Sequence, residues 1–234
     1  MNLCVIPAKK HSQRLPGKNR RSFLGKPIIQ YSIDTALNSG IFDRIVVSSD
    51  CDEIGTMVAK MGAIYHRRSP ELAMPDTPMV DVVLDVIHGK WVITPPYSYH
   101  TKTDPEFVCM IYPCAPFVTV EQLVHGLDKL KEGFDVVFPV YKGPHPEGSF
   151  LIRDNRLVGR YPEHEDENSC LWPDAYYSAG SWYWAAVKTL EETRSFTAGL
   201  LYGIEVPGEE VQDIDDEADW TRAEIKYRIM RGGE

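Results

Sequence analysis

The fold is decided by two short runs of β-branched residues, LCVIP at 3–7 and IVVSS at 45–49, which predict strands. The stretch between them carries apolar residues at helical spacing, namely Ile28, Ile29, Ile33, Ala36 and Leu37. A strand, a helix and a second strand in this order predict a βαβ unit. Residues 3–49 therefore begin an α/β fold.

The same alternation continues along the chain. We expect helices at 52–61, 79–88 and 120–132, and strands at 63–66, 107–113 and 136–140. Gly62 and Gly133 are expected to end two of these helices, and Thr119 and Gln122 have the spacing of a capping box. The strand FVCMIYP at 107–113 is almost continuously apolar, as expected of a strand that is covered on both faces. This order predicts a three-layer α/β/α fold with a parallel sheet between its helices.

The chain changes character at 141–175, where several prolines lie among glycines and acidic residues. Within this stretch, LIRDNRLV at 151–158 has the pattern of a short hairpin. We therefore interpret residues 1–234 as one domain in which 141–175 forms a projecting arm. Such an arm commonly serves as an oligomer contact.

Two further strands are predicted after this arm, at 181–187 (SWYWAAV) and 203–207 (GIEVP). In the first, alternation directs Trp182 and Trp184 to one side of the sheet and Tyr183 to the other. We expect the two tryptophans to be core or interface residues. Asp216 is placed to cap a final helix, whose buried face would carry Trp220, Ala223, Tyr227 and Met230.

Composition and charge limit the partners of this protein. With 43% hydrophobic and 25% charged residues, the chain of 234 residues has an ordinary globular composition. Its formal net charge of −9 disfavours binding to nucleic acid or to an anionic membrane. The sequence predicts neither a signal peptide nor a membrane span. The five cysteines show no metal-finger spacing, so we expect free thiols and a cytoplasmic protein.

The first predicted strand runs into a basic loop, IPAKKHSQRLPGKN at 6–19. Its cations are Lys9, Lys10, Arg14 and Lys18, and Arg20 follows. In an open α/β sheet, ligands bind beyond the carboxyl ends of the strands, where this loop would lie. Lysine and arginine side chains suit phosphate oxygens, so a polyphosphate is the natural ligand. The alternative is a solvated basic loop. The GxxxxGK[ST] pattern of a P-loop is absent.

The second chemical signal is acidic and lies in VQDIDDEADW at 211–220. Asp213 and Asp215 are two residues apart, which directs both carboxylates to the same face of an extended chain. Paired carboxylates of this kind are a potential site for Mg²⁺ bound to phosphate oxygens. The alternative is an acidic turn, and the acids from Asp216 to Asp219 are expected at a helix start.

The basic loop resembles the N-terminal signature of the CMP-sialic acid synthetase family. The resemblance continues, in the order of that family, through FLGKPIIQYSI, FDRIVVSSD, ELAMPDTP, MIYPCAPF, AYYSAGSWYW and VQDID. It is greatest with the pseudaminic acid cytidylyltransferase branch. The string RLPGK is also similar to Kdo cytidylyltransferases, but Asn19 follows it where those enzymes usually have proline.

This resemblance implies a Rossmann-like fold of the nucleotide-diphospho-sugar transferase type and a homodimer that packs through the 141–175 arm. It also implies a reaction in which Mg²⁺ assists the transfer of CMP from CTP to the anomeric hydroxyl of an acidic nine-carbon sugar. Pyrophosphate would be released. Two alternatives are an enzyme acting on an eight-carbon acid such as Kdo and a non-catalytic nucleotide-binding protein of the same fold.

Matching this sequence to the family position by position assigns roles to individual residues. Lys9, Lys18 and Asp215 are implied as catalytic residues. The implied nucleotide-binding residues are Ala8, Lys9, Ser12, Lys18, Asn19, Arg68, Asp76 and Thr77. Among them, Arg68 corresponds to a cytidine-contacting arginine, and Asp76 and Thr77 to the segment that brackets the base. The implied sugar-binding residues are Tyr112, Tyr177, Ser178, Gly180 and Ser181. Asp213 and Asp215 match the two metal-binding aspartates of the family.

The sequence departs from the family pattern at several positions. Lys10 and His11 replace a small or neutral pair, and Cys114 replaces a common threonine. YYSAGS at 176–181 stands where the pseudaminic branch typically has YHDAGQ. These last changes fall in the expected sugar pocket, so the exact sugar remains open.

Overall fold

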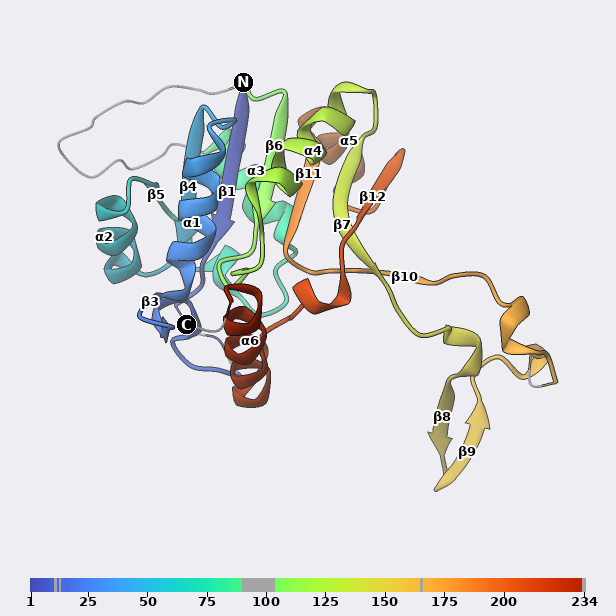
Figure 1. Cartoon of the computed structure of the whole chain (residues 1–234). Coiled ribbons are helices and arrows are strands. Elements are labelled where there is room, and N and C mark those ends of the chain that lie inside the picture. Colours follow the sequence, from blue (N-terminus) through green and yellow to red (C-terminus); the bar gives the residue numbers. More distant parts are fainter. Residues whose placement is uncertain (11, 13, 90–103, 165, 233–234) are drawn as a thin grey trace.

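In a computed structural model of the protein, residues 1–10, 12, 14–89, 104–164 and 166–232 are described. The strands of the main sheet are β1 (Asn2–Pro7), β4 (Arg44–Ser49), β5 (Ile64–Arg67), β6 (Phe107–Ile111), β7 (Val136–Lys142), β10 (Tyr176–Ser178), β11 (Trp182–Ala186) and β12 (Leu201–Glu205). In the described part of the chain they form one eight-stranded sheet in the order β10-β7-β11-β6-β1-β4-β5, with β12 paired to β7 (Figure 1).

The sheet is mostly parallel, as expected, but it also contains antiparallel pairs. β1 pairs in parallel with β4 and β6, and β4 pairs in parallel with β5. β12 is also parallel to β7, but β11 runs antiparallel to both β6 and β7. The physical reason lies in the connection after β7. The chain leaves and re-enters the sheet at the same end without a crossover helix, so the returning strands run antiparallel.

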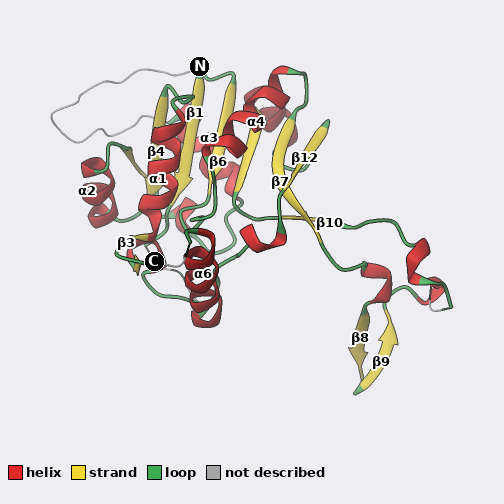
Figure 2. Cartoon of the chain, in the orientation of Figure 1, coloured by secondary structure: helices red, strands yellow, loops and turns green. Residues whose placement is uncertain are grey.

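Helices cover both faces of the sheet, so the predicted three-layer arrangement is confirmed (Figure 2). One face packs against α1 (Ile28–Ser39), α2 (Asp52–Lys60) and α4 (Val120–Lys131). The opposite face packs against α3 (Met79–His88) and α5 (Val187–Thr193). Side chains of β11 alternate as predicted: Trp182 and Trp184 are fully buried in the first layer, and Tyr183 packs in the second.

The ends of two helices follow the predicted signals. α2 and α4 end just before Gly62 and Gly133, which adopt the left-handed conformation that favours glycine. At the start of α4, the Thr119 hydroxyl accepts a hydrogen bond from the Gln122 backbone amide at 3.2 Å. The Gln122 side chain does not bond back to Thr119, because it accepts a hydrogen bond from Trp182 Nε1 at 3.3 Å.

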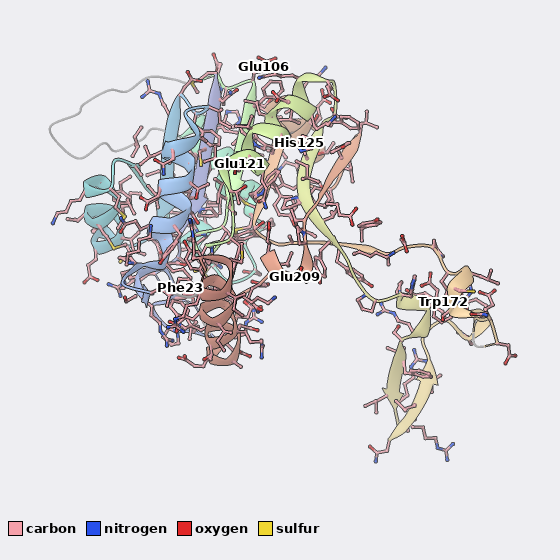
Figure 3. All side chains as sticks on the ribbon, in the orientation of Figure 1. Phe23, Glu106, Glu121, His125, Trp172 and Glu209 are labelled. Atoms are coloured by element: carbon pink, nitrogen blue, oxygen red, sulfur yellow. The ribbon has the colours of Figure 1, made fainter. Side chains whose placement is uncertain are left out.

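The final helix, α6 (Glu217–Met230), packs beside the small antiparallel pair β2 (Ser22–Phe23) and β3 (Lys26–Pro27). Phe23, which Figure 3 labels beside α6, contacts a ring of that helix. Its ring centroid lies 5.5 Å from that of Trp220. Asp216 caps the helix as predicted. Met230, which was expected on the buried face, is exposed because the last turn extends beyond the cluster that Trp220 joins.

The predicted hairpin within the 141–175 segment is confirmed. β8 (Phe150–Arg153) pairs in antiparallel register with β9 (Arg156–Gly159), and the hairpin lies well away from the main sheet (Figure 1). Asp154 and Asn155 form the turn with positive φ angles of 50° and 60°, as a two-residue hairpin turn requires. The large apolar side chains of this hairpin are mostly exposed. Within the described residues, no helix combines the length and apolarity needed to cross a membrane.

Candidate active site

A cleft of about 670 Å³ lies where the loops after β1 and β6 approach the turn before α6. This turn carries Asp213 and Asp215 and is called the acidic turn below. β1, β4 and β6 run in parallel, so the loops that follow them meet at one edge of the sheet, where ligands of open α/β sheets bind. The predicted site residues that line this cleft are Lys9, Ser12, Lys18, Asn19, Tyr112, Gly180, Ser181, Asp213 and Asp215. Segments that are distant in sequence therefore share one cavity.

The basic loop is held against the sheet by hydrogen bonds of its backbone and of Asn19. The Ala8 amide donates to the Ser48 carbonyl at 2.8 Å, and the Lys10 amide donates to Asp50 Oδ1 at 2.7 Å. The buried Asn19 side chain donates from Nδ2 to the Lys9 carbonyl at 2.8 Å. Ala8 itself is buried and does not line the cleft. Lys10 is exposed, and His11 lies outside the described residues.

Lys9 and Lys18 are presented by different parts of the loop. Lys9 Nζ donates to the Met74 carbonyl at 3.1 Å, and burial together with the nearby Arg68 charge lowers the pKa of Lys9. Gly17 has a left-handed conformation, with φ of 71°, and leads into the 3₁₀ helix Lys18–Arg20. Lys18 Nζ donates to the Ile214 carbonyl. Two ammonium groups are thus available to phosphate oxygens in the cleft.

Asp215 joins the basic loop to the acidic turn. Its Oδ1 atom lies 2.7 Å from Arg14 Nη2 and 3.9 Å from Lys18 Nζ. Arg14 also lines the cleft, although the sequence analysis did not assign it to the site. Its position in the predicted phosphate-binding loop was the one signal that could have identified it. The cleft therefore holds cations and a carboxylate in direct contact.

Asp213 lies beside Asp215 and faces the cleft. The cleft walls limit the hydration of its carboxylate, and this desolvation, followed by the charge of Asp215, raises the pKa of Asp213. A divalent cation bound between the two carboxylates would relieve the repulsion that the Asp215 charge exerts on Asp213. Mg²⁺ commonly binds one or two carboxylates together with substrate phosphates. Among the described residues, no group of three or more histidine, cysteine or acidic side chains could hold a metal.

The turn that carries these aspartates is fixed by Asp219. Asp219 Oδ2 accepts hydrogen bonds from the backbone amides of Asp215 and Asp216, at 3.0 and 3.1 Å. In return, the Asp219 amide donates to Asp216 Oδ1 at 2.8 Å, which completes a capping box. Asp219 therefore does more than complement the helix dipole, because it holds the backbone that presents Asp215.

The residues expected around the base differ in exposure, since Arg68 is buried and Asp76 is exposed. Arg68 is only 2% exposed and does not line the cleft, and neither do Asp76 and Thr77. The neighbouring Pro75 and Met79 line it instead. Burial lowers the pKa of Arg68 to about 10, and its Nη1 atom is buried without a hydrogen-bond partner.

Four of the five residues expected around the sugar line a cavity. Tyr112, Gly180 and Ser181 line the main cleft, whereas Ser178 lines an adjoining pocket of about 720 Å³ that shares Gly180, Asp213 and Asp215 with it. Burial, followed by the neighbouring Tyr183 and Asp213, raises the pKa of Tyr112 to about 12.

Tyr177 lines neither cavity. Its hydroxyl donates to the Pro144 carbonyl at 3.0 Å, and its ring lies 6.0 Å from that of Tyr141. It thus packs at the base of the 141–175 segment. Cys114, which lines the main cleft, donates from Sγ to Asn19 Oδ1 at 3.2 Å. Burial raises its pKa to about 12, so the thiol is neutral.

Comparison with known proteins gives the family. The chain is 32% identical to the pseudaminic acid cytidylyltransferase of Campylobacter jejuni, over 97% of each chain. It is also 32% identical to the CMP-N,N'-diacetyllegionaminic acid synthase of Legionella pneumophila, over 95% of this chain and 94% of that one. A solved CMP:2-keto-3-deoxy-manno-octonic acid synthetase complexed with CTP has the same fold, with a TM-score of 0.65 and 18% identity over 98% of each chain. The cytidylyltransferase family model matches residues 3–140. The resemblance seen in the sequence is confirmed: this chain belongs to the cytidylyltransferase family.

Proposed function

We propose that this protein transfers CMP from CTP to the anomeric hydroxyl of a nonulosonic acid, of the pseudaminic acid type, and releases pyrophosphate. The observation that carries the proposal is the cleft in which Lys9 and Lys18 of the basic loop meet Asp213 and Asp215 of the acidic turn. The names of the C. jejuni and L. pneumophila relatives support an acidic-sugar acceptor.

In this reaction the anomeric hydroxyl oxygen attacks the α-phosphorus of CTP. A new phosphorus–oxygen bond forms to the sugar, and the bond from the α-phosphorus to the bridging oxygen breaks. The electron pair of that bond leaves with pyrophosphate. Such a transfer depends mainly on positioning and on neutralising phosphate charge.

The residues of the cleft have distinct roles in this proposal. Lys9 and Lys18 neutralise charge on the departing pyrophosphate, and Ser12 donates a neutral hydrogen bond to the phosphates. Asp215 accepts the proton of the attacking hydroxyl. Asp213 and Asp215 would hold Mg²⁺, which supplies charge neutralisation at the phosphate oxygens when it is bound.

The acceptor is proposed to bind on the Tyr112 side of the cleft. Gly180 and Asp215 line both the main cleft and the adjoining pocket, so a sugar there would have its reactive hydroxyl near the metal-binding carboxylates. Ser181 and Ser178 offer neutral hydroxyl groups to the sugar. Tyr177 is left out of this assignment because its hydroxyl is engaged at Pro144.

We further propose that the enzyme is a cytoplasmic homodimer. Ile152 and Leu157 are 76% and 70% exposed on the β8–β9 hairpin, and apolar surface of this kind favours a contact with a second subunit. All five cysteines carry free thiols, which is usual in a reducing compartment.

Pyrophosphate release tests the proposed function. Purified protein would be mixed with CTP, Mg²⁺ and one acid at a time: pseudaminic, legionaminic, N-acetylneuraminic acid or Kdo. We expect turnover with the nine-carbon acids and the highest kcat/KM with pseudaminic acid. The Asp215→Asn variant, which keeps the shape but loses the charge, should be about 100-fold slower or worse.

Two results of this assay would contradict the proposal. A preference for Kdo would make the protein an eight-carbon acid cytidylyltransferase. Binding of CTP without turnover of any acid would make it a non-catalytic nucleotide-binding protein. Nucleotide binding would be measured in parallel by calorimetry, so that these two results are separated.

A further inference from the structure

A buried group of polar side chains lies behind the basic loop that follows β1. Ser48, His66 and Arg68 are 0%, 4% and 2% exposed. Ser48 is the penultimate residue of β4 and is paired in the sheet with Pro7 of β1 on one side and His66 of β5 on the other. Asp85 of α3 approaches His66 from the helical layer. Three separate elements thus place polar groups beneath the loop that begins at Ala8.

Ser48 holds one edge of the Arg68 guanidinium. Arg68 Nε donates to Ser48 Oγ at 3.1 Å, and Arg68 Nη2 donates to the Ser48 carbonyl at 2.8 Å. The same carbonyl accepts the backbone amide of Ala8 at 2.8 Å. Ser48 therefore links the orientation of Arg68 to the start of the basic loop.

His66 and Asp85 determine to which atom the Ser48 hydroxyl donates its hydrogen bond. Asp85 Oδ2 lies 3.4 Å from His66 Nε2, and Ser48 Oγ lies 3.2 Å from His66 Nδ1. A carboxylate only accepts hydrogen bonds, so it favours the imidazole tautomer that carries its proton on Nε2. Nδ1 is then an acceptor for the Ser48 hydroxyl proton. This arrangement leaves the lone pairs of Ser48 Oγ available to Arg68.

These bonds leave one nitrogen of Arg68 free. Nη1 is buried and has no partner, and a buried donor of a charged group is costly when it remains unpaired. The nitrogen carries two N–H groups, so it suits two adjacent acceptors. Lys9, which lines the cleft, is close enough for the Arg68 charge to affect it. An acceptor that enters beside Lys9 would satisfy Nη1.

The surroundings of Arg68 favour the base over the phosphates as its ligand. The charged groups around Arg68 are Lys9, Asp50 and Asp85, whereas Asp215 is surrounded by Arg14 and Lys18. Arg68 thus belongs to a different part of the site from the acidic pair where phosphate chemistry is proposed. Cytosine offers two adjacent acceptors, O2 and N3, but in uracil N3 carries a hydrogen and is a donor.

The family resemblance implies that Arg68 contacts the cytidine. We propose that Ser48 and His66 are positioning residues that hold Arg68 in this contact, so that Nη1 donates to the O2 and N3 acceptors of cytosine, and that this fixed geometry selects CTP over UTP. The inference rests on the proposed function for the identity of the nucleotide. Because a fixed guanidinium cannot turn away from the N3–H of uracil, its rigidity is the source of the selectivity. A loosened Arg68 would still carry its charge but would discriminate less.

Calorimetric binding of CTP and of UTP tests this proposal in the full-length protein. His66→Leu removes the acceptor for Ser48, whereas His66→Asn retains an acceptor close to the Nδ1 position. We expect His66→Leu to bind CTP about tenfold more weakly and to lose most of its preference over UTP. His66→Asn should keep most of both. The KM for the acidic sugar should change little in either variant.

Controls separate this role from a general loss of stability. His125→Leu makes the same substitution on the exposed side of α4 and should change neither nucleotide affinity. If His66→Leu does not fold, Arg68→Lys gives an independent test, because it keeps the charge but lacks the paired N–H groups of Nη1. That variant should also lose the preference for CTP.

Two results would overturn the inference: an unchanged ratio of CTP affinity to UTP affinity in a folded His66→Leu variant, and an unchanged ratio in Arg68→Lys. If the ratio is unchanged because both affinities fall equally, Arg68 would be assigned to the phosphates. A wild-type protein that turns over no sugar would contradict the proposed function alone, since the binding comparison does not depend on turnover.

Discussion

Asp215 is the residue through which the acidic turn contacts the basic loop. The spacing of Asp213 and Asp215 predicted that their carboxylates share a face, and the structure places both on the cleft. The sequence could not predict that Arg14 pairs with Asp215, because several cations share that loop and its folding selects one of them. The sequence also could not predict that Arg68 is buried, since its burial depends on Ser48, His66 and Asp85 from three elements.

Lys18 is the residue for which we expect the largest loss of activity. Replacement by alanine removes a cation from the phosphate side of the cleft, so turnover should fall by about 100-fold or more with every sugar. Lys18→Arg should recover little, because a planar fork does not replace a compact ammonium group. Pyrophosphate release at saturating CTP measures the effect, with Lys131→Ala on the surface of α4 as a control. A loss confined to one sugar would instead assign Lys18 to the acceptor pocket.

His66 makes the stability of the fold depend on pH. Burial, and to a smaller extent the Arg68 charge, lowers its pKa below the ordinary value of 6.5, although Asp85 opposes this effect. Below pH 6.5 the unfolded chain therefore binds more protons at this position than the folded protein does. The contribution of neutral His66 is fully present above that pH and is lost as the pH falls through the folded pKa.

The melting temperature between about pH 5 and 8 tests this dependence. Wild-type protein should lose more stability than the His66→Asn variant as the pH falls, because asparagine does not titrate. Parallel curves for the two proteins would show that His66 does not contribute.

At the scale of elements, alternation and helix-end signals predicted most of the structure. The helices expected at 52–61, 79–88 and 120–132 end within one residue of their predicted limits. The direction of β11 was not predicted, because strand direction depends on where the preceding segment re-enters the sheet. β12 lies two residues earlier than the predicted strand at 203–207, since it is residues 201–205 that pair with β7.

The packing of α4 on β11 depends on Gly126. A Cβ atom at this position would lie 2.6 Å from Trp184 Cδ1 and 2.9 Å from Trp182 Cη2, so alanine would overlap two buried rings. We expect Gly126→Ala to destabilise the protein by about 1–3 kcal/mol. This expected loss exceeds the gain of about 1 kcal/mol in helix propensity.

Urea unfolding measures this effect. Gly208→Ala is a matched control, because a Cβ atom there meets nothing within 4 Å. A Gly126→Ala variant that is as stable as wild type would show that the tryptophans move to accommodate the new methyl group.

At the scale of the whole molecule, the β8–β9 hairpin is the feature least explained by the fold of a single chain. Ile152 and Leu157 are paired across the hairpin and exposed, so they would be buried by a second subunit. The double variant Ile152→Asp with Leu157→Asp should therefore be monomeric. Light scattering after size-exclusion chromatography measures the mass. Leu200→Asp, at an exposed position outside the hairpin, is the control and should remain dimeric. A monomeric wild-type protein would contradict the proposed dimer.

The central claim is that the anomeric hydroxyl of the sugar attacks the α-phosphorus of CTP in the cleft between the basic loop and the acidic turn. The most direct test uses a nonulosonic acid that carries a heavy-oxygen label at the anomeric hydroxyl, with unlabelled CTP. Phosphorus NMR of the products then locates the label. We predict that it is bound to the phosphorus of the CMP-sugar and is absent from pyrophosphate. A product in which the phosphorus of CMP shows no isotope shift, or label in pyrophosphate, would contradict the account.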